Sequence, residues 1–314
     1  MFKGSIVALV TPFKGNEIDE FALRKLVDWH ISEGTDGIVP VGTTGESPTL
    51  NHDEHERVVE IVIDQSNKRV PIIAGTGSNS TAEAINLLKH AESAGADAAL
   101  VVTPYYNKPT PEGLYAHYEA LDSASSGIPI IIYNIPSRSV IDINVDLMGR
   151  LSHLQSIVGV KDATSDISRI KEHNELCEDG FIQLSGEDET IYEYMINGGQ
   201  GCISVTANIL PKVCSDMHKA FSNNDLEEAK RLNNILMPLH KSLFIETSPS
   251  PVKYILSKMD LIDYEIRLPL VKIRQETKSI LDEIISNLEI KYQHYIKIQS
   301  ITVIITDASL YRAP

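Results

Sequence analysis

Residues 156–164 read Ser156-Ile157-Val158-Gly159-Val160-Lys161-Asp162-Ala163-Thr164. The first five predict a short buried β-strand, and a lysine follows them directly. An ammonium group is costly to desolvate, so Lys161 either caps the strand and reaches solvent or is an amine held neutral in an apolar pocket. Only the second kind of lysine attacks a carbonyl carbon readily. The rest of the chain has to decide between these two interpretations.

Seven more short apolar runs, ended by Gly, Pro or Thr, lie on either side of this strand. Together the eight predicted strands are Ser5–Thr11, Gly37–Val41, Pro71–Gly75, Ala98–Thr103, Pro129–Asn134, Ser156–Lys161, Phe181–Ser185 and Gly201–Thr206. Most are hydrophobic without interruption rather than alternating, which is typical of a parallel sheet covered by helices.

Helices are predicted between the strands. An apolar face from Phe21 to Ile31 ends before Gly34, a common helix stop. Asn51 and Ser80 each stand three residues before a glutamate, which is the pattern of a helix N-terminus.

Eight strand–helix units in about 210 residues predict an α/β fold, a (β/α)8 TIM barrel. A nucleotide-binding open sheet would carry a GxGxxG motif after its first strand, and this chain has none there. After Asn208 only helices are predicted. We therefore expect a barrel over residues 1–210, a C-terminal α-helical extension over 211–290 and an atypical tail over 291–314. The helices expected in the extension are Lys212–Phe221, Leu226–Phe244, Val252–Met259 and Leu270–Leu288.

The composition excludes several classes of function. A net charge of −15 opposes nucleic-acid or anionic-membrane binding. Three cysteines without CxxC spacing predict neither a disulfide scaffold nor a zinc site. The first apolar run is too short for a signal peptide, and no segment is long enough to span a membrane, so we expect a cytoplasmic protein.

In a barrel of this type the chemistry lies at the C-terminal ends of the strands, and here these ends are polar. They carry Gly42-Thr43-Thr44-Gly45-Glu46-Ser47, Gly75-Thr76-Gly77, Thr103-Pro104-Tyr105-Tyr106-Asn107, Tyr133-Asn134-Ile135-Pro136-Ser137-Arg138, Lys161, Gly186-Glu187 and Ser204-Val205-Thr206-Ala207-Asn208. A Gly-Thr-Thr-Gly turn is suited to receive a carboxylate, and a phenol near the lysine is suited to move protons. Each group alone is explained as well by packing, a turn or a solvated charge. Their convergence favours Lys161 as a nucleophile that forms a Schiff base with a 2-oxo acid.

Five motifs also resemble a known family. GTTGES at 42–47, TPYYN at 103–107, YNIPSR at 133–138, GVKDAT at 159–164 and SVTAN at 204–208 are similar to those of the dihydrodipicolinate synthases, which belong to the class I pyruvate-dependent aldolases and lyases. The resemblance covers residues 1 to about 290. It implies that Lys161 condenses with pyruvate and that the enamine attacks the aldehyde of L-aspartate 4-semialdehyde, in a step of the diaminopimelate route to lysine.

The resemblance also implies roles for individual residues. Tyr133 would be the general acid–base, linked through Thr43 to Tyr106 of a neighbouring subunit, so that a dimer is the smallest complete unit and a homotetramer, a dimer of dimers, is usual. Arg138 would bind the carboxylate of the semialdehyde. The pyruvyl end would be held by Thr43, Thr44 and the backbone of Ile203, with Gly186 lining the pocket. No cofactor or metal is expected, because a protonated imine already supplies the electron sink.

Members inhibited by lysine carry a polar set at the dimer interface, and this chain has its counterparts, Ser47, His52, His55, Asn79, Glu83 and Tyr105. The alternative is that these residues only cap helices. The chain departs from the family pattern at Ser139-Val140, which follow Arg138, at Pro48, and beyond residue 290. The tail contains the β-prone run 301–306, an aggregation hazard if it is exposed.

Two other functions remain open from the sequence. One is a sibling aldolase acting on N-acetylneuraminate or a 2-keto-3-deoxy-sugar acid, against which Arg138 and Tyr106 argue. The other is a silent barrel that only senses an oxo acid.

Overall fold

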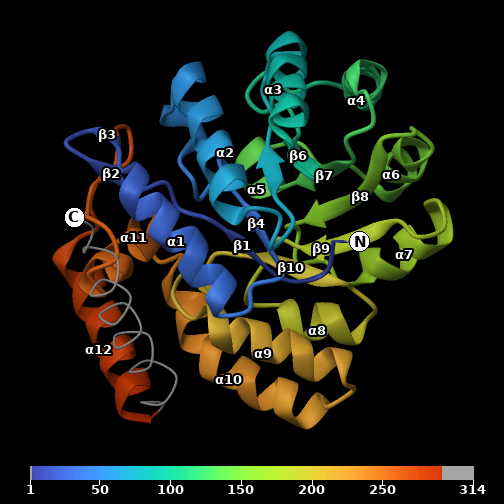
Figure 1. Cartoon of the computed structure of the whole chain (residues 1–314). Helices are drawn as coiled ribbons and strands as arrows, with labels where there is room; N and C mark the ends of the chain where they lie inside the picture. The colour runs from blue at the N-terminus through green and yellow to red at the C-terminus, as the bar shows by residue number, and fades with distance from the viewer. Residues whose placement is uncertain (1, 292–314) are drawn as a thin grey trace.

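Eight parallel strands form the centre of the molecule in a computed structural model that describes residues 2–291 (Figure 1). They are β1 (Gly4–Ala8), β4 (Gly37–Val39), β5 (Ile73–Gly75), β6 (Ala98–Val102), β7 (Ile130–Asn134), β8 (Ile157–Asp162), β9 (Ile182–Ser185) and β10 (Gly201–Ser204). Each falls on a predicted run, and its ends differ from the predicted ones by at most three residues. The predicted TIM barrel is therefore confirmed, and the expected tail over 291–314 lies, from residue 292 on, outside the described residues.

The barrel closes between its first and last neighbours in the sheet order β4-β1-β10-β9-β8-β7-β6-β5. A bridge between Ile38 and Ile72 joins β4 to the segment entering β5, and the Gly75 amide donates to the Pro40 carbonyl at 3.1 Å. A closed barrel leaves no strand edge for another chain to pair with. An isolated bridge instead of a long ladder accounts for β4 and β5 being only three residues each.

Helices surround the strands on the outside (Figure 1). They are α1 (Glu20–Ser32), α2 (His52–Ser66), α3 (Thr81–Ala94), α4 (Pro111–Ala124), α5 (Pro136–Ser139), α6 (Val145–Ser152), α7 (Ser168–Leu176), α8 (Ile191–Ile196), α9 (Pro211–Ser222), α10 (Leu226–Ser242), α11 (Ser250–Lys258) and α12 (Gln275–Lys291). Short 3₁₀ turns, η1 (Ser47–Thr49) and η2 (Thr206–Asn208), follow β4 and β10.

The predicted helix starts are present. The Asn51 side chain accepts from the Glu54 amide at 2.9 Å and the Glu54 carboxylate accepts from the Asn51 amide at 3.0 Å, which is a complete capping box. The Ser80 hydroxyl accepts from the Glu83 amide at 3.4 Å, but the Glu83 carboxylate does not return to the cap. It bonds to His52 and Ser78 instead, so the second pattern is only half a capping box.

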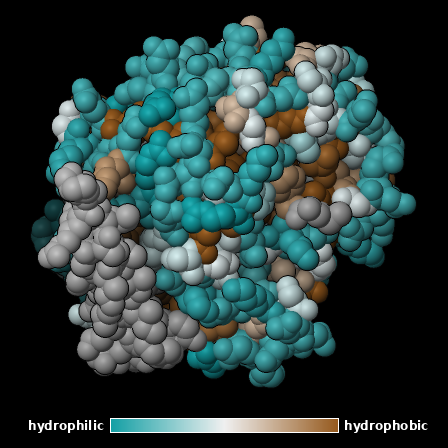
Figure 2. Space-filling view, in the orientation of Figure 1, coloured by the Kyte–Doolittle hydropathy of each residue, from teal (hydrophilic) through white to brown (hydrophobic). Residues whose placement is uncertain are grey.

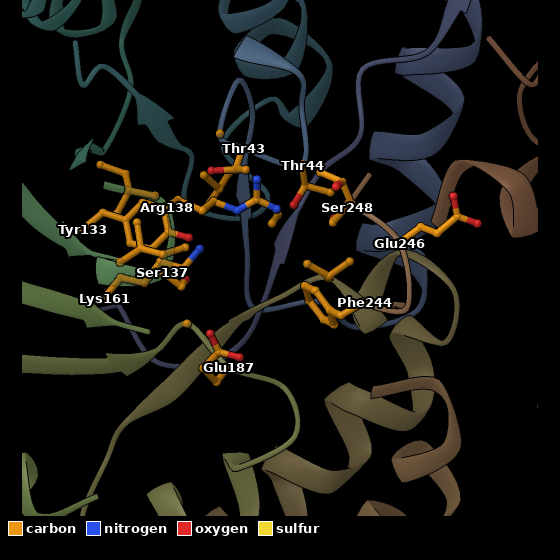
Figure 3. A pocket seen from close by; sticks show the side chains of 18 of the residues that line it. Thr43, Thr44, Tyr133, Ser137, Arg138, Lys161, Glu187, Phe244, Glu246 and Ser248 are labelled. Atoms are coloured by element: carbon orange, nitrogen blue, oxygen red, sulfur yellow. The ribbon is translucent and has the colours of Figure 1, made fainter. Parts of the chain in front are cut away.

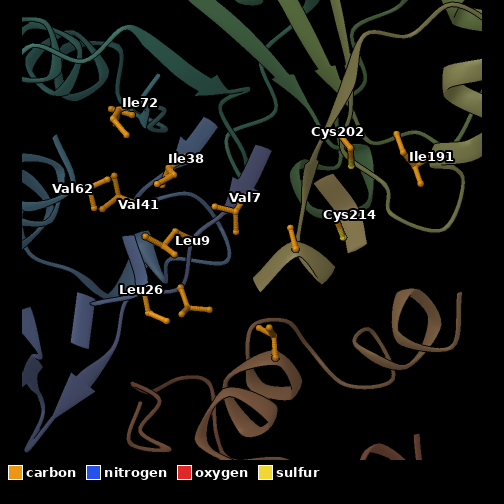
Figure 4. Packing of buried hydrophobic residues seen from close by; sticks show 14 of the residues in the cluster. Val7, Leu9, Leu26, Ile38, Val41, Val62, Ile72, Ile191, Cys202 and Cys214 are labelled. Carbon is orange, nitrogen blue, oxygen red and sulfur yellow. The ribbon is translucent and has the colours of Figure 1, made fainter. Parts of the chain in front are cut away.

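Two apolar layers hold the barrel together. One fills its interior with residues such as Ile6, Leu100, Ile131 and Leu184. The other lies between strands and helices, where Val7, Leu9 and Ile38 meet side chains of α1 and α2 (Figure 4). Burying two faces of each strand explains the uninterrupted hydrophobic runs. The visible surface is mostly hydrophilic, and the most strongly apolar residues in view lie largely in hollows (Figure 2).

The structure corrects the sequence analysis at three places. A small hairpin, β2 (Phe13–Lys14) and β3 (Glu17–Ile18), was not predicted, and it turns through Gly15 and Asn16, both at positive φ. The helix expected from Leu270 begins only at Gln275, because the Ile273 and Arg274 amides donate to Tyr264 Oη and Glu246 Oε1 rather than to a helical turn. The helix expected to reach Phe244 ends at Ser242.

The C-terminal helices differ in whether they pack directly on a strand of the barrel. Helix α9 packs on β1 as the last helix of the barrel, whereas α10 packs mainly on α9, and α12 packs on both α10 and α11. We therefore propose a boundary between barrel and extension after α9 rather than at residue 210. No helix of residues 2–291 is long and apolar enough to cross a membrane.

Candidate active site

Lys161 and Tyr133 lie side by side on neighbouring strands. In the β7–β8 register Tyr133 pairs with Lys161, and the Lys161 Nζ lies 4.0 Å from the centre of the Tyr133 ring. Both residues are buried, each 6% exposed. Lys161 lies within β8 rather than after it, so the pleat directs its side chain into the barrel. Lys161 is therefore not a lysine that caps the strand and reaches solvent.

The turn that follows β4 lies beside this pair. Thr43 and Thr44 line the same pocket, Thr43 half-buried and Thr44 buried. The turn is closed by hydrogen bonds from the Gly45 amide to the Gly42 carbonyl and from the Glu46 amide to the Thr43 carbonyl, both 3.1 Å. Two threonine hydroxyls and free turn amides are the kind of group that receives a carboxylate.

Arg138 lies in the short helix α5 and reaches both this pocket and a second one. The Ser139 that follows it is buried, and its hydroxyl donates to the Ile135 carbonyl at 2.9 Å. Val140 takes a left-handed φ of 68° and is 63% exposed. The unusual Ser139-Val140 pair thus closes α5 and leaves the Arg138 side chain exposed toward the pocket.

These groups meet in a cavity of about 550 Å³ at the C-terminal ends of the strands (Figure 3). Lys161, Arg138 and Glu187 project into one space, with Phe244 on the side opposite Lys161. Gly186 is also in the wall, because a Cβ there would lie 3.1 Å from the Lys161 Cε. Ile203 is not among the lining residues, and its side chain fills the barrel interior; Val205, two residues further on, does line the pocket.

Several residues of the wall have no role assigned from the sequence. They are Ser137, Glu187, Val205 and the segment Phe244, Ile245, Glu246, Thr247 and Ser248. Ser137, Glu187 and Val205 all stand at predicted strand ends, so their positions were a usable signal. The segment 244–248 lies far away in the chain, and no strand pattern marks it. Only the packing of α10 and α11 brings it here.

Glu187 has an unusual carboxyl group. Burial, followed by the charge of neighbouring Asp188, raises the pKa of Glu187 to about 7, although Lys161 and Arg138 act in the opposite direction. A carboxyl group in a cleft with such a perturbed pKa is typical of a functional site.

The third member of the expected relay is elsewhere. Tyr106 is 90% exposed with a φ of 69°, and it lines neither cavity of its own chain. Within one chain the structure thus brings Tyr133 and Thr43 to one pocket and leaves Tyr106 pointing outward.

A second cavity of about 360 Å³ lies behind the turn. Of the six residues expected at an effector site, five line it, namely Ser47, His52, His55, Glu83 and Tyr105. Asn79 is adjacent and accepts from the Tyr105 amide at 2.8 Å. Glu83 accepts from His52 at 2.6 Å, and hydrogen bonds from Ser78 and His52 lower the pKa of Glu83, whereas burial lowers that of His55 to about 4.

We looked for side chains that could bind a metal ion in the part of the chain that the structure describes. Among residues 2–291 no group of three or more His, Cys, Asp or Glu side chains is arranged to hold a metal ion.

Comparison with known proteins places this geometry in context. The model of the dihydrodipicolinate synthetase family matches residues 1–288. A 4-hydroxy-tetrahydrodipicolinate synthase of Pelagibacter ubique is 58% identical over 286 residues, which cover 90% of this chain and 97% of that protein.

Solved structures agree with the sequence comparison. A dihydrodipicolinate synthase from Acinetobacter baumannii, complexed with pyruvate, superimposes with a TM-score of 0.89 at 48% identity, covering 92% of this chain and 99% of that one. A synthase from Cyanidioschyzon merolae with lysine bound has a TM-score of 0.88 at 32% identity, covering 91% and 98%.

Proposed function

This chain belongs to the dihydrodipicolinate synthetase family, and from that premise we propose that it condenses pyruvate with L-aspartate 4-semialdehyde to 4-hydroxy-tetrahydrodipicolinate through an imine on Lys161. The observation that carries the proposal is the buried amine of Lys161 beside the Tyr133 ring, in a pocket that also holds Thr43, Thr44 and Arg138. It is a lyase reaction of the diaminopimelate route to lysine.

The first half of the reaction activates pyruvate. The Lys161 amine attacks C2 of pyruvate, a C–N bond forms, and loss of water gives the imine. Tyr133 donates the proton that the departing oxygen needs, and Thr43 and Thr44 receive the pyruvate carboxylate. Loss of a proton from C3 then gives the enamine, because the protonated imine nitrogen accepts the electron pair.

The second half forms the new C–C bond and frees the lysine. The enamine carbon attacks the aldehyde carbon of the semialdehyde, whose carboxylate Arg138 binds as a bidentate partner. The amino group of the adduct then attacks the imine carbon, closes the ring and displaces the Lys161 amine. Overall one water leaves, and no oxidant, reductant or cofactor is consumed.

A substrate comparison tests this function against its sibling aldolases. The purified chain should form product from pyruvate and aspartate 4-semialdehyde, with no cleavage of N-acetylneuraminate or a 2-keto-3-deoxy-sugar acid above background. Arg138→Ala should raise the KM for the semialdehyde by at least ~10-fold and leave the KM for pyruvate nearly unchanged. Turnover of the sugar acids alone would contradict the proposal.

We propose a dimer as the smallest complete unit and a dimer of dimers as the full assembly. The support is Tyr106, which is exposed on its own chain although its family counterpart acts next to the relay threonine. Exposed Val140 near α5 would be covered in the same contact. Sedimentation should give a tetramer, and a monomer with full activity would contradict this assembly.

We also propose feedback inhibition by lysine at the second cavity. Glu83 offers a carboxylate for the α-ammonium group of the ligand, with His52 and His55 beside it. Millimolar lysine should inhibit the enzyme, and Glu83→Ala should weaken inhibition by at least ~10-fold. Helix α3 already has its cap from Ser80, so the variant should fold. Absence of inhibition in both proteins would refute the proposal.

The cytoplasm is the location we propose. Cys177, Cys202 and Cys214 are free among the described residues, and Cys202 and Cys214 are buried, which fits a reducing compartment.

A further inference from the structure

The turn over residues 42–45 is held between two residues in unfavourable backbone conformations. Val41 has a φ of 48° and Glu46 a φ of 55°, both in the left-handed region. Side chains with a Cβ avoid this region, and a β-branched residue such as valine avoids it most. Such conformations persist only where the surroundings enforce them, and they concentrate at functional sites.

The Glu46 side chain shows what enforces the second of them. It is completely buried, as is that of Lys253, and the Glu46 Oε1 lies 2.5 Å from the Lys253 Nζ. The Glu46 Oε2 accepts from the Arg267 amide at 3.1 Å. The backbone amide of Glu46 in turn donates to the Thr43 carbonyl. The residue whose side chain is anchored in this way is therefore hydrogen-bonded directly to a residue of the carboxylate-binding turn.

The partner of Glu46 comes from the C-terminal extension, 207 residues further along the chain. Lys253 lies in α11, directly after the segment 244–248 that lines the pocket. Its Nζ also lies 4.2 Å above the Phe13 ring of the hairpin, and the Arg267 guanidinium lies 4.2 Å from the same ring. The extension, the hairpin and the turn are thus fixed to one another at a single buried cluster.

We propose that Glu46 and Lys253 are a positioning pair that sets the turn over residues 42–45 in the conformation that receives the carboxylate of the 2-oxo acid. The inference rests on the proposed function, because it assigns that carboxylate to Thr43 and Thr44. Neither residue of the pair lines the pocket around Lys161. Loss of the pair should therefore weaken recognition of the carboxylate and leave the Lys161 amine reactive.

Borohydride trapping on the full-length enzyme separates these two effects. The imine is reduced at increasing concentrations of pyruvate or of propanal, a carbonyl compound without a carboxylate. Lys253→Met should raise the half-saturating concentration of pyruvate by at least about 10-fold and change that of propanal by less than about 2-fold. Lys258→Met, on the exposed side of the same helix, is the matched control and should change neither.

A second variant covers the case in which Lys253→Met does not fold. Removing one member of a buried ion pair leaves an uncompensated charge, whereas removing both does not. Glu46→Gln combined with Lys253→Met should therefore melt close to the wild-type temperature and still show the raised half-saturation for pyruvate. Restored stability together with wild-type pyruvate binding would mean that the pair is only structural, and would overturn the proposal.

Two further outcomes are decisive. If the half-saturating concentrations of pyruvate and of propanal rise equally, the substitution acts on Lys161 itself, and this result would also overturn the proposal. If the wild-type enzyme traps propanal but not pyruvate, the proposed function fails, and the assignment of the pair fails with it.

Discussion

At the scale of single residues, the chemistry that we propose follows from one break in a hydrophobic strand. Lys161 was identifiable from the sequence because an ammonium group does not belong in such a run without a reason. Its partner Tyr133 was identifiable because both lie at strand ends of one barrel face. That Lys161 and Tyr133 are neighbours could not be predicted from the sequence, because it depends on the β7–β8 register and on a register shift between Ile130 and Ile131.

Tyr133→Phe removes the proton donor without emptying the space around Lys161. We expect kcat to fall by about 10²–10⁴-fold, the usual contribution of general acid–base catalysis. Tyr115→Phe on helix α4, where the ring stacks with Arg150, serves as control and should keep full activity. Steady-state kinetics decide the matter, and a Tyr133→Phe enzyme within twofold of wild type would remove Tyr133 from the mechanism.

Glu187 should lower the free energy of unfolding of the substrate-free enzyme at neutral and alkaline pH. Its pKa in the folded chain is raised from 4.5 to about 7, so the protonated form is the favoured one when the chain is folded. Below about pH 4.5 both the folded and the unfolded chain hold the proton. As pH rises from there the unfolded chain gives it up first, so the free energy of unfolding falls, and the loss is complete once pH has passed about 7.

The Glu187→Gln substitution removes this penalty. At pH 8 the variant should be more stable than wild type by on the order of 1 kcal/mol, after allowance for the partial exposure of the group. At pH 4.5 the two should melt together. Thermal unfolding at both pH values is the measurement, with exposed Glu119→Gln as control, and an equal shift at both values would contradict the assignment.

At the scale of elements, the sequence determined which segments form strands and helices better than where these end. Uninterrupted apolar runs identified all eight strands, and side-chain caps identified α2 and α3. The hairpin β2–β3 has only two residues a strand, too few for a periodic pattern. The false start at Leu270 arose because tertiary hydrogen bonds to Tyr264 and Glu246 compete with the helix.

The capping box of α2 provides a test at this scale. Asn51→Ala removes the acceptor for the Glu54 amide and should lower stability by about 1 kcal/mol, whereas Asn51→Ser should restore it. Because α2 carries His52 and His55, we also expect Asn51→Ala to weaken inhibition by lysine more than catalysis. Urea unfolding together with inhibition curves checks both parts. Equal stability of the two variants would show that the cap contributes nothing.

At the scale of the whole molecule, the pocket is built from parts that lie far apart in the chain. The barrel supplies Lys161 and Tyr133, and the extension supplies the segment 244–248. Sequence patterns describe local structure, so the predicted site lacked that second wall. The same reasoning applies to Tyr106, which is exposed on its own chain and which we propose to act in the site of a partner subunit.

Mixed assemblies test whether Tyr106 acts across subunits. Lys161→Ala and Tyr106→Phe should each be nearly inactive alone. In a mixed dimer, the site on the Tyr106→Phe chain keeps its lysine and receives an intact tyrosine from its partner. Random pairing makes half of the dimers mixed, each with one good site, so co-expression should recover about a quarter of wild-type activity.

The matched control pairs Lys161→Ala with Tyr133→Phe. Both of those residues act within one chain, so no site is repaired and no activity should return. Recovery in the control, or none in the first mixture, would contradict action across subunits.

The most direct test of the central claim is borohydride reduction in the presence of pyruvate, followed by mass analysis of the peptides. We expect one modified lysine, Lys161, in the wild-type enzyme. We expect none in Lys161→Ala, which should fold normally and have lost at least ~10³-fold in turnover. A wild-type enzyme without an adduct, or with its adduct on another lysine, would contradict the account.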